Sequence, residues 1–235
     1  MTRIYYPEIE LSWENKYLKN RSYPQSVRIT TPGFLENIQR LLYDYDDNDV
    51  RPYFQRLHSF LKQDDQRLTG VMDYKNPLDW MGVYYTCWGM VSCINEKVKS
   101  ILEKNCADSD YLLKPISVKG VEDPYYVLFV YMLSFEEAGV VFSESEYAVV
   151  DRNSSHFGEK IHLNGPEEYR KHQLDYVPKR LCIHPLIKKK GIYFIESCSH
   201  IFYAPEIAKS FVANKVSGAR IVPANENCIL TVLSE

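Results

Sequence analysis

The stretch Tyr125-Tyr126-Val127-Leu128-Phe129-Val130-Tyr131-Met132-Leu133 is an unbroken apolar run near the middle of the chain. Polar and apolar residues do not alternate in it, which is typical of a strand that is covered on both faces. The run is much shorter than the roughly 18 apolar residues of a membrane-spanning helix. We therefore expect it to form a central strand of the main sheet.

Shorter stretches rich in strand-favouring residues lie on both sides of this run. We expect strands at 26–30, 81–88, 113–118, 139–142, 147–150, 180–184, 192–196, 201–203, 220–222 and 228–233, and helices at 34–43, 52–61, 92–104 (with Ser92 as its N-cap) and 205–214. Because the two kinds of element do not alternate regularly, they predict an α+β fold with a mixed, mostly antiparallel sheet. We divide the chain into an N-terminal segment with two helices, residues 1–80, and an α+β domain, residues 81–235.

Two short segments echo each other at an offset of 110 residues. They are Asn95-Glu96-Lys97-Val98-Lys99-Ser100-Ile101-Leu102 and Pro205-Glu206-Ile207-Ala208-Lys209-Ser210-Phe211-Val212. Each places apolar residues at helical spacing and is followed by an expected strand. The echo indicates an internal helix-strand duplication, which describes a scaffold and no reaction.

Composition excludes several classes of protein. The net charge of -3 argues against general nucleic-acid binding, and the basic run Lys188-Lys189-Lys190-Gly191 is typical of a hairpin tip. The N-terminus lacks the apolar run of a secretory signal, and no stretch is long enough to span a membrane. Six dispersed cysteines without an export signal are typical of reduced thiols. We therefore expect a cytoplasmic protein that does not bind membranes.

Two Cys-x-His pairs are the strongest candidates for chemistry: Cys182 with His184, and Cys198 with His200. Their thiolate and imidazole groups are ligands that zinc prefers, although the spacing lacks the usual pair with two to four intervening residues. One of the thiols with a histidine base would be the core of a Cys-His hydrolase. The third interpretation treats the cysteines as small buried hydrophobes, and we favour it. Since no phosphate loop, nucleophile elbow or His-Glu-x-x-His motif is present, we expect no enzyme, bound metal or cofactor.

Two other features are typical of protein recognition. The loop between the first two expected helices carries four carboxylates in six residues, and acidic clusters steer basic partners. The chain also holds 19 tyrosines, which give large contact area at low entropic cost when exposed. A solvated loop and half-buried tyrosines on the sheet are the alternatives. The partner-binding candidates are Asp44, Tyr45, Asp46, Asp47, Asp49, Tyr84 and Tyr85.

Two blocks of the sequence carry a resemblance to a known family. The later block is Ile201-Phe202-Tyr203, a helix, and then Gly218-Ala219-Arg220-Ile221-Val222-Pro223. The earlier block joins Val91-Ser92 and its helix to Leu113-Lys114-Pro115-Ile116 and Tyr125-Tyr126-Val127-Leu128. Together they resemble bacterial polymorphic-toxin immunity family eleven, or a close neighbouring immunity family, over roughly residues 81 to 225.

The resemblance implies a cytoplasmic protein that binds a cognate toxin domain and occludes its active site. The family has no catalytic residues and no cofactor to carry over to this chain. Two alternatives come from other classes of protein: a small Cys/His-based hydrolase or zinc-binding protein, and a scaffold subunit of a larger assembly.

Overall fold

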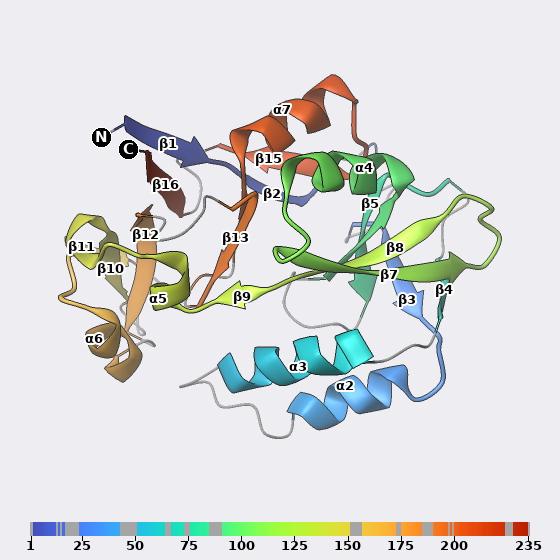
Figure 1. Cartoon of the computed structure of the whole chain (residues 1–235), viewed down its shortest axis with the longest axis horizontal. Helices are drawn as coiled ribbons and strands as arrows, with labels where there is room; N and C mark the ends of the chain where they lie inside the picture. The colour runs from blue at the N-terminus through green and yellow to red at the C-terminus, as the bar shows by residue number, and fades with distance from the viewer. Residues whose placement is uncertain are drawn as a thin grey trace.

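A computed structural model provides the structure of the chain (Figure 1). The residues that it describes are 2–12, 14, 16, 24–42, 51–63, 67–72, 76–84, 91–150, 157–172, 175–184, 190–196, 198, 200–223 and 228–234. Within them, strands form two five-stranded sheets and one closed barrel, and α-helices pack against these. The α+β class predicted from the sequence is confirmed.

The closed barrel contains six strands in the order β3-β4-β7-β8-β6-β5. They are β3 (Ser26–Ile29), β4 (Leu68–Val71), β5 (Trp80–Tyr84), β6 (Val91–Asn95), β7 (Tyr111–Val118) and β8 (Tyr125–Val130). Strand β8 pairs with β6 on one side and with β7 on the other, as its apolar run predicted. Helices α2 (Phe34–Leu42) and α3 (Arg51–Gln63) connect β3 to β4 and pack on each other.

A second sheet continues directly from β8, because the apolar run passes through Tyr131 into β9 (Met132–Leu133). Its order is β15-β2-β14-β13-β9. The other strands are β2 (Glu8–Leu11), β13 (Ile192–Ile195), β14 (Ile201–Tyr203) and β15 (Ala219–Val222). We call it the middle sheet, since it lies between the barrel and the third sheet in Figure 1.

The middle sheet repeats five strands of the barrel. Its order β15-β2-β14-β13-β9 matches β7-β8-β6-β5-β3, and every neighbouring pair has the same relative direction in both. Helix α4 (Glu96–Asn105) joins β6 to β7 as α7 (Pro205–Ala213) joins β14 to β15, and the two helices pack together (Figure 1). The sequence echo therefore falls on equivalent helices of two like units. Strand β2 from the N-terminus occupies the place that β8 holds in the barrel.

The third sheet has the order β1-β16-β12-β10-β11. Its strands are β1 (Thr2–Tyr6), β10 (Glu146–Val150), β11 (Phe157–Ile161), β12 (Tyr176–Ile183) and β16 (Ile229–Ser234). Three short helical elements lie between β9 and β12 in the sequence: α5 (Phe135–Ala138), the 3-10 turn η1 (Phe142–Glu144) and α6 (Pro166–Lys171). Arg170 on α6 donates to the buried Glu196 carboxylate, at the end of β13, at 2.6 Å. This ion pair ties α6 to the middle sheet.

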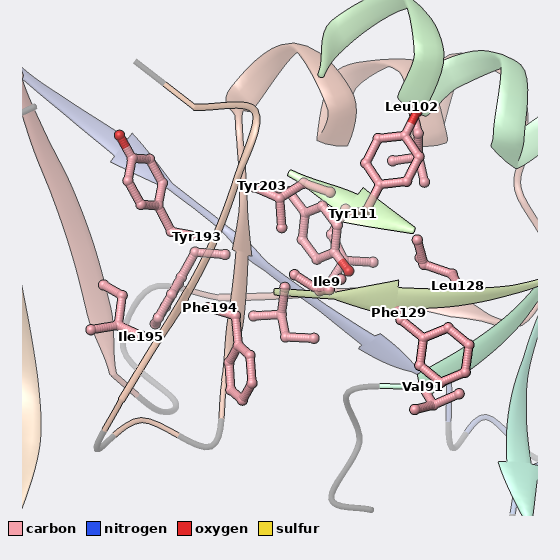
Figure 2. Close-up of a cluster of buried hydrophobic side chains, with 14 of the residues drawn as sticks. Ile9, Val91, Leu102, Tyr111, Leu128, Phe129, Tyr193, Phe194, Ile195 and Tyr203 are labelled. Atoms are coloured by element: carbon pink, nitrogen blue, oxygen red, sulfur yellow. The ribbon is translucent and has the colours of Figure 1, made fainter. Parts of the chain in front are cut away.

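One buried core connects the barrel and the middle sheet. Figure 2 shows Ile9 and Tyr203 from the middle sheet in the same cluster as Val91, Leu128 and Phe129 from the barrel. Burial of apolar side chains from both sides removes the joint surface from water, which is the main favourable contribution to folding. The two units therefore share one hydrophobic interior.

Asp79, just before β5, connects the barrel to the middle sheet through hydrogen bonds near α4 and α7. Its carboxylate accepts from Asn95 Nδ2 at 2.6 Å, from Lys97 Nζ at 2.9 Å, and from the backbone N–H and Oγ of Ser217 at 2.8 and 2.9 Å. Burial alone would raise the pKa of Asp79, but these donors hold it below its usual value. The residue links the start of α4 with the turn that follows α7.

Three local predictions differ from the structure. Ser92 lies inside β6, and Asn95 is the N-cap of α4, its side chain accepting the Val98 N–H. Residues 139–142 form no strand, because Gly139, with a φ of 73°, ends α5 in the left-handed conformation. The expected hairpin at Lys188 to Gly191 is wrong as well, since β12 and β13 belong to different sheets.

Strand pairing also crosses the boundary drawn at residue 80. Strands β3 and β4 belong to the same barrel as β5 to β8, and β1 and β2 pair with strands near the C-terminus. The first eighty residues thus supply strands to all three sheets.

Candidate functional site

A polar cavity lies between the middle sheet and the outer face of the barrel. It has a volume of about 400 Å³, which falls in the range of about 300–1,000 Å³ typical of small-molecule sites. Gly82 lines it, and the absence of a side chain there lets Ser26 and Leu11 pack close to the β5 backbone, because a Cβ would lie 2.8 Å from Ser26 Oγ and 3.0 Å from Leu11 Cδ1. The lining residues are Glu8, Ile9, Glu10, Leu11, Ser26, Trp80, Gly82, Val83, Val91, Ser92, His200, Ile201 and Tyr203.

Three buried lining residues carry hydrogen-bond donors without a protein partner. The side chains of Trp80, Ser92 and Tyr203 make no hydrogen bond within the described part of the chain, although the residues are only 3%, 7% and 1% exposed. Trp80 and Tyr203 form a T-shaped pair with ring centroids 6.0 Å apart. Trp80 and Ser92 lie on the same face of the β5–β6 pair, because Trp80 pairs with Ile94 and Gly82 with Ser92. The donor groups of these three residues make the cavity wall polar.

Charged groups lie at the mouth of the cavity. His200 Nδ1 is 2.7 Å from Glu8 Oε1, and Arg220 donates to Glu10 Oε1 at 2.6 and 2.9 Å. The side chains of His200 and Glu10 are 27% and 29% exposed, so they reach solvent. Burial lowers the pKa of His200, but the Glu8 carboxylate and the Cys198 sulfur outweigh burial and raise it. Glu8 therefore favours the imidazolium form.

The structure separates the two Cys-x-His pairs that the sequence singled out. Cys182 lies in β12, where its backbone N–H donates to Ser145 Oγ at 3.0 Å, and His184 N–H donates to the Gly139 carbonyl. Cys198 and His200 precede β14 in the middle sheet. Among the described residues, no group of three or more Cys, His, Asp or Glu side chains is arranged to hold a metal ion.

Cys198 has an unusual environment of its own. A hydrogen bond from Cys228 lowers the pKa of the Cys198 thiol, the nearby His200 lowers it further, and burial opposes both effects. The same contact and burial raise the pKa of Cys228. Cys198 is 4% exposed and does not line the polar cavity. The pKa of the thiol is thus lowered, but the thiol lies out of reach of a bulky substrate.

A second, smaller cavity of about 240 Å³ lies between α3 and the barrel. Its walls are largely apolar, with Leu57 and Leu61 from α3 opposite Val91 and Phe129. His58 packs against Tyr131 there, with ring centroids 4.1 Å apart and the ring planes tilted by 54°. Burial and the neighbouring Lys62 lower the pKa of His58, so its imidazole is neutral at neutral pH.

The predicted partner-binding residues lie outside the part of the chain that the structure describes. This holds for Asp44, Tyr45, Asp46, Asp47, Asp49 and Tyr85, and for the side chain of Tyr84, whose backbone ends β5. Of the tyrosines expected on the sheets, Tyr6 and Tyr125 are buried in the core. Tyr5 and Tyr126 are half-buried, as the alternative interpretation expected.

Apart from His200, the lining of the polar cavity was missed by reasoning from the sequence. Its other polar residues come from β2, β3, β5, β6 and β14, and no local pattern marks them as neighbours. The available signal was Glu8 and Glu10, which alternate with Ile9 and Leu11 in an expected polar segment.

Comparison with known proteins adds no further assignment: no protein-family model and no curated protein matches the sequence. None of the helices that the structure describes is long and apolar enough to cross a membrane.

Proposed function

We propose that this protein is an immunity protein: it binds a cognate toxin domain in the cytoplasm and occludes the toxin's active site without catalysis. The observation that carries the proposal concerns the two sequence blocks that resemble immunity family eleven. They correspond to the β6-α4-β7-β8 unit and the β14-α7-β15 unit, which have the same topology and pack helix to helix. The resembling residues thus form the scaffold itself.

A rigid scaffold suits a protein that acts by occlusion. Asp79 joins the two units through four hydrogen bonds, and Arg170 joins α6 to the middle sheet. A surface that is already ordered before association loses little conformational entropy on binding, so more of the contact energy appears as affinity. Tight inhibition by a preformed surface is the expected mode of action.

We propose that the contact surface includes the acidic loop, with Asp44, Asp46, Asp47 and Asp49, and the tyrosines Tyr45, Tyr84 and Tyr85. Carboxylates at the rim of an interface raise the association rate with a basic partner, and aromatic anchors supply most of the binding energy. The toxin domain is therefore expected to present a basic surface around its active site.

The test uses the toxin domain encoded beside the gene for this chain. Co-expression should rescue cells from that domain, and the purified proteins should form a stable complex. Replacing the four loop aspartates by alanine should lower the association rate about tenfold at low salt and flatten its salt dependence. The control replaces Asp108, Glu122 and Asp123, acidic residues in turns elsewhere, by alanine. An unchanged association rate removes the loop from the interface, and a failure to rescue or bind refutes the immunity function.

A Cys-His hydrolase remains the second candidate because Cys198 has a lowered pKa beside the His200–Glu8 pair. It requires that a substrate reach a buried thiol. Hydrolysis of a thioester or peptide library that disappears in Cys198→Ser, while Cys182→Ser retains it, would establish this activity in place of the immunity function.

A further inference from the structure

The polar cavity has chemistry that toxin binding does not use. Three side-chain donors that make no hydrogen bond within the described residues line it. The carboxylates of Glu8 and Glu10 line it as well. The indole N–H of Trp80 can only donate, and the hydroxyls of Ser92 and Tyr203 are able to donate beside it. A group that satisfies all three must offer acceptor oxygens, and a carboxylate offers the most acceptor sites in the smallest volume.

The mouth of the cavity offers a carboxylate oxygen as an acceptor. Glu8 is paired with His200, whereas the two hydrogen bonds that Arg220 donates to Glu10 fall on one oxygen, Oε1. Within the described residues, Glu10 Oε2 accepts no hydrogen bond, and its side chain reaches solvent. A cationic nitrogen that enters behind a carboxylate would donate to this oxygen.

From these two ends we propose that the polar cavity binds a small zwitterion of the amino-acid class. Its carboxylate accepts from Trp80, Ser92 and Tyr203, and its ammonium group donates to Glu10. The inference is independent of the proposed immunity function, because none of the residues that line the cavity belongs to the proposed contact residues.

Other ligand classes fit the cavity less well. A purely apolar molecule would leave the three donors unpaired in a buried site, which is unfavourable. A phosphate or another anion without a cationic group would leave Glu10 Oε2 without a donor. A simple amine would satisfy the mouth and leave the inner donors without acceptors. Only a molecule that carries both charges a short distance apart satisfies both ends.

The experiment measures binding of each of the twenty common L-amino acids to the full chain by isothermal titration calorimetry. Acetate and ethylamine serve as probes that carry one charge each. We expect saturable binding, with one site per chain, for at least one amino acid, and at least tenfold weaker binding of acetate and ethylamine. The conservative variants Tyr203→Phe and Ser92→Ala should each weaken amino-acid binding about tenfold, because each removes one hydrogen bond to a charged group.

Matched controls remove the same groups away from the cavity. Tyr111→Phe changes a buried tyrosine of β7, and Ser117→Ala changes an exposed serine of the same strand; neither residue lines the cavity. Circular dichroism establishes that each variant is folded, and Ser92→Ala carries the test alone if Tyr203→Phe is not. The inference is overturned if no amino acid binds at millimolar concentration, if the cavity variants bind as the wild type does, or if acetate binds as tightly as the amino acids.

Discussion

The Asp79 junction allows a quantitative prediction of stability. Replacing Asp79 by alanine removes the acceptor for the Ser217 backbone N–H and the Asn95 amide, which lie in a part-buried junction. Leaving a buried donor unpaired costs about 1–3 kcal/mol. Lys97 is 42% exposed and regains water, so its ion pair contributes less than about 1 kcal/mol. We therefore expect Asp79→Ala to lower the free energy of unfolding by about 3 kcal/mol.

The junction also predicts a rescue by a double substitution. In Asp79→Asn, the amide oxygen can replace Oδ2, which accepts from Lys97 and Ser217, but the new NH₂ group then faces the Asn95 NH₂ group. If the Asn95 amide rotated, its Oδ1 could no longer accept the hydrogen bond from the Val98 N–H that caps α4. Asn95→Asp restores an acceptor at this position and keeps a good N-cap. The double variant should be at least about 1 kcal/mol more stable than the sum of the two single effects predicts.

Urea denaturation at neutral pH measures these differences, with Asp108→Ala, in an exposed turn, as the control. If the changes in unfolding free energy of the two single variants are additive, or if Asp79→Ala is as stable as Asp108→Ala, Asp79 does not stabilise the junction as described.

Two further predictions concern the backbone and pH. Gly218 has a φ of 86°, and a Cβ there would collide with the Trp80 carbonyl. Gly120 has a φ of 78°, but a Cβ there would have nothing within 4 Å. Gly218→Ala should therefore lower the melting temperature far more than Gly120→Ala, and equal losses would contradict this. Folding raises the pKa of His200, so the stabilisation from its pair with Glu8 is fully present below the unfolded pKa of about 6.5 and is lost as pH rises through the folded pKa. Glu8→Gln should consequently reduce the free energy of unfolding more at about pH 6 than at about pH 9, and a difference from the wild type that does not vary with pH would contradict the assignment.

Local sequence patterns predicted most of the elements because each pattern reports burial on one face of the chain. The run at residues 125–133 was expected to be central, and β8 does lie between β6 and β7. The pattern could not reveal that Tyr131 separates two strands in different sheets, because both continue an apolar stretch. Closure of the barrel was equally hidden, since the parallel pairs β3–β5 and β4–β7 join segments with no shared local signal.

The candidate site was less predictable than the fold. Cys198 and His200 were named from the sequence, but their relevant neighbours, Cys228 and Glu8, lie at opposite ends of the chain. The polar cavity is lined by residues of the barrel and the middle sheet, and the close packing beside it depends on the missing side chain of Gly82. Both are properties of packing and leave no pattern in the order of residues.

The pairing of β1 with β16, in which Thr2 lies opposite Ser234, has a consequence for biosynthesis. The barrel strands β3 to β8 can associate soon after they leave the ribosome, but β1 must wait until the distant strand β16 has been translated before its partner exists. Until then its unpaired backbone groups are open to association with other nascent chains. We therefore expect shielding of β1 by a chaperone during synthesis to govern the yield of native protein.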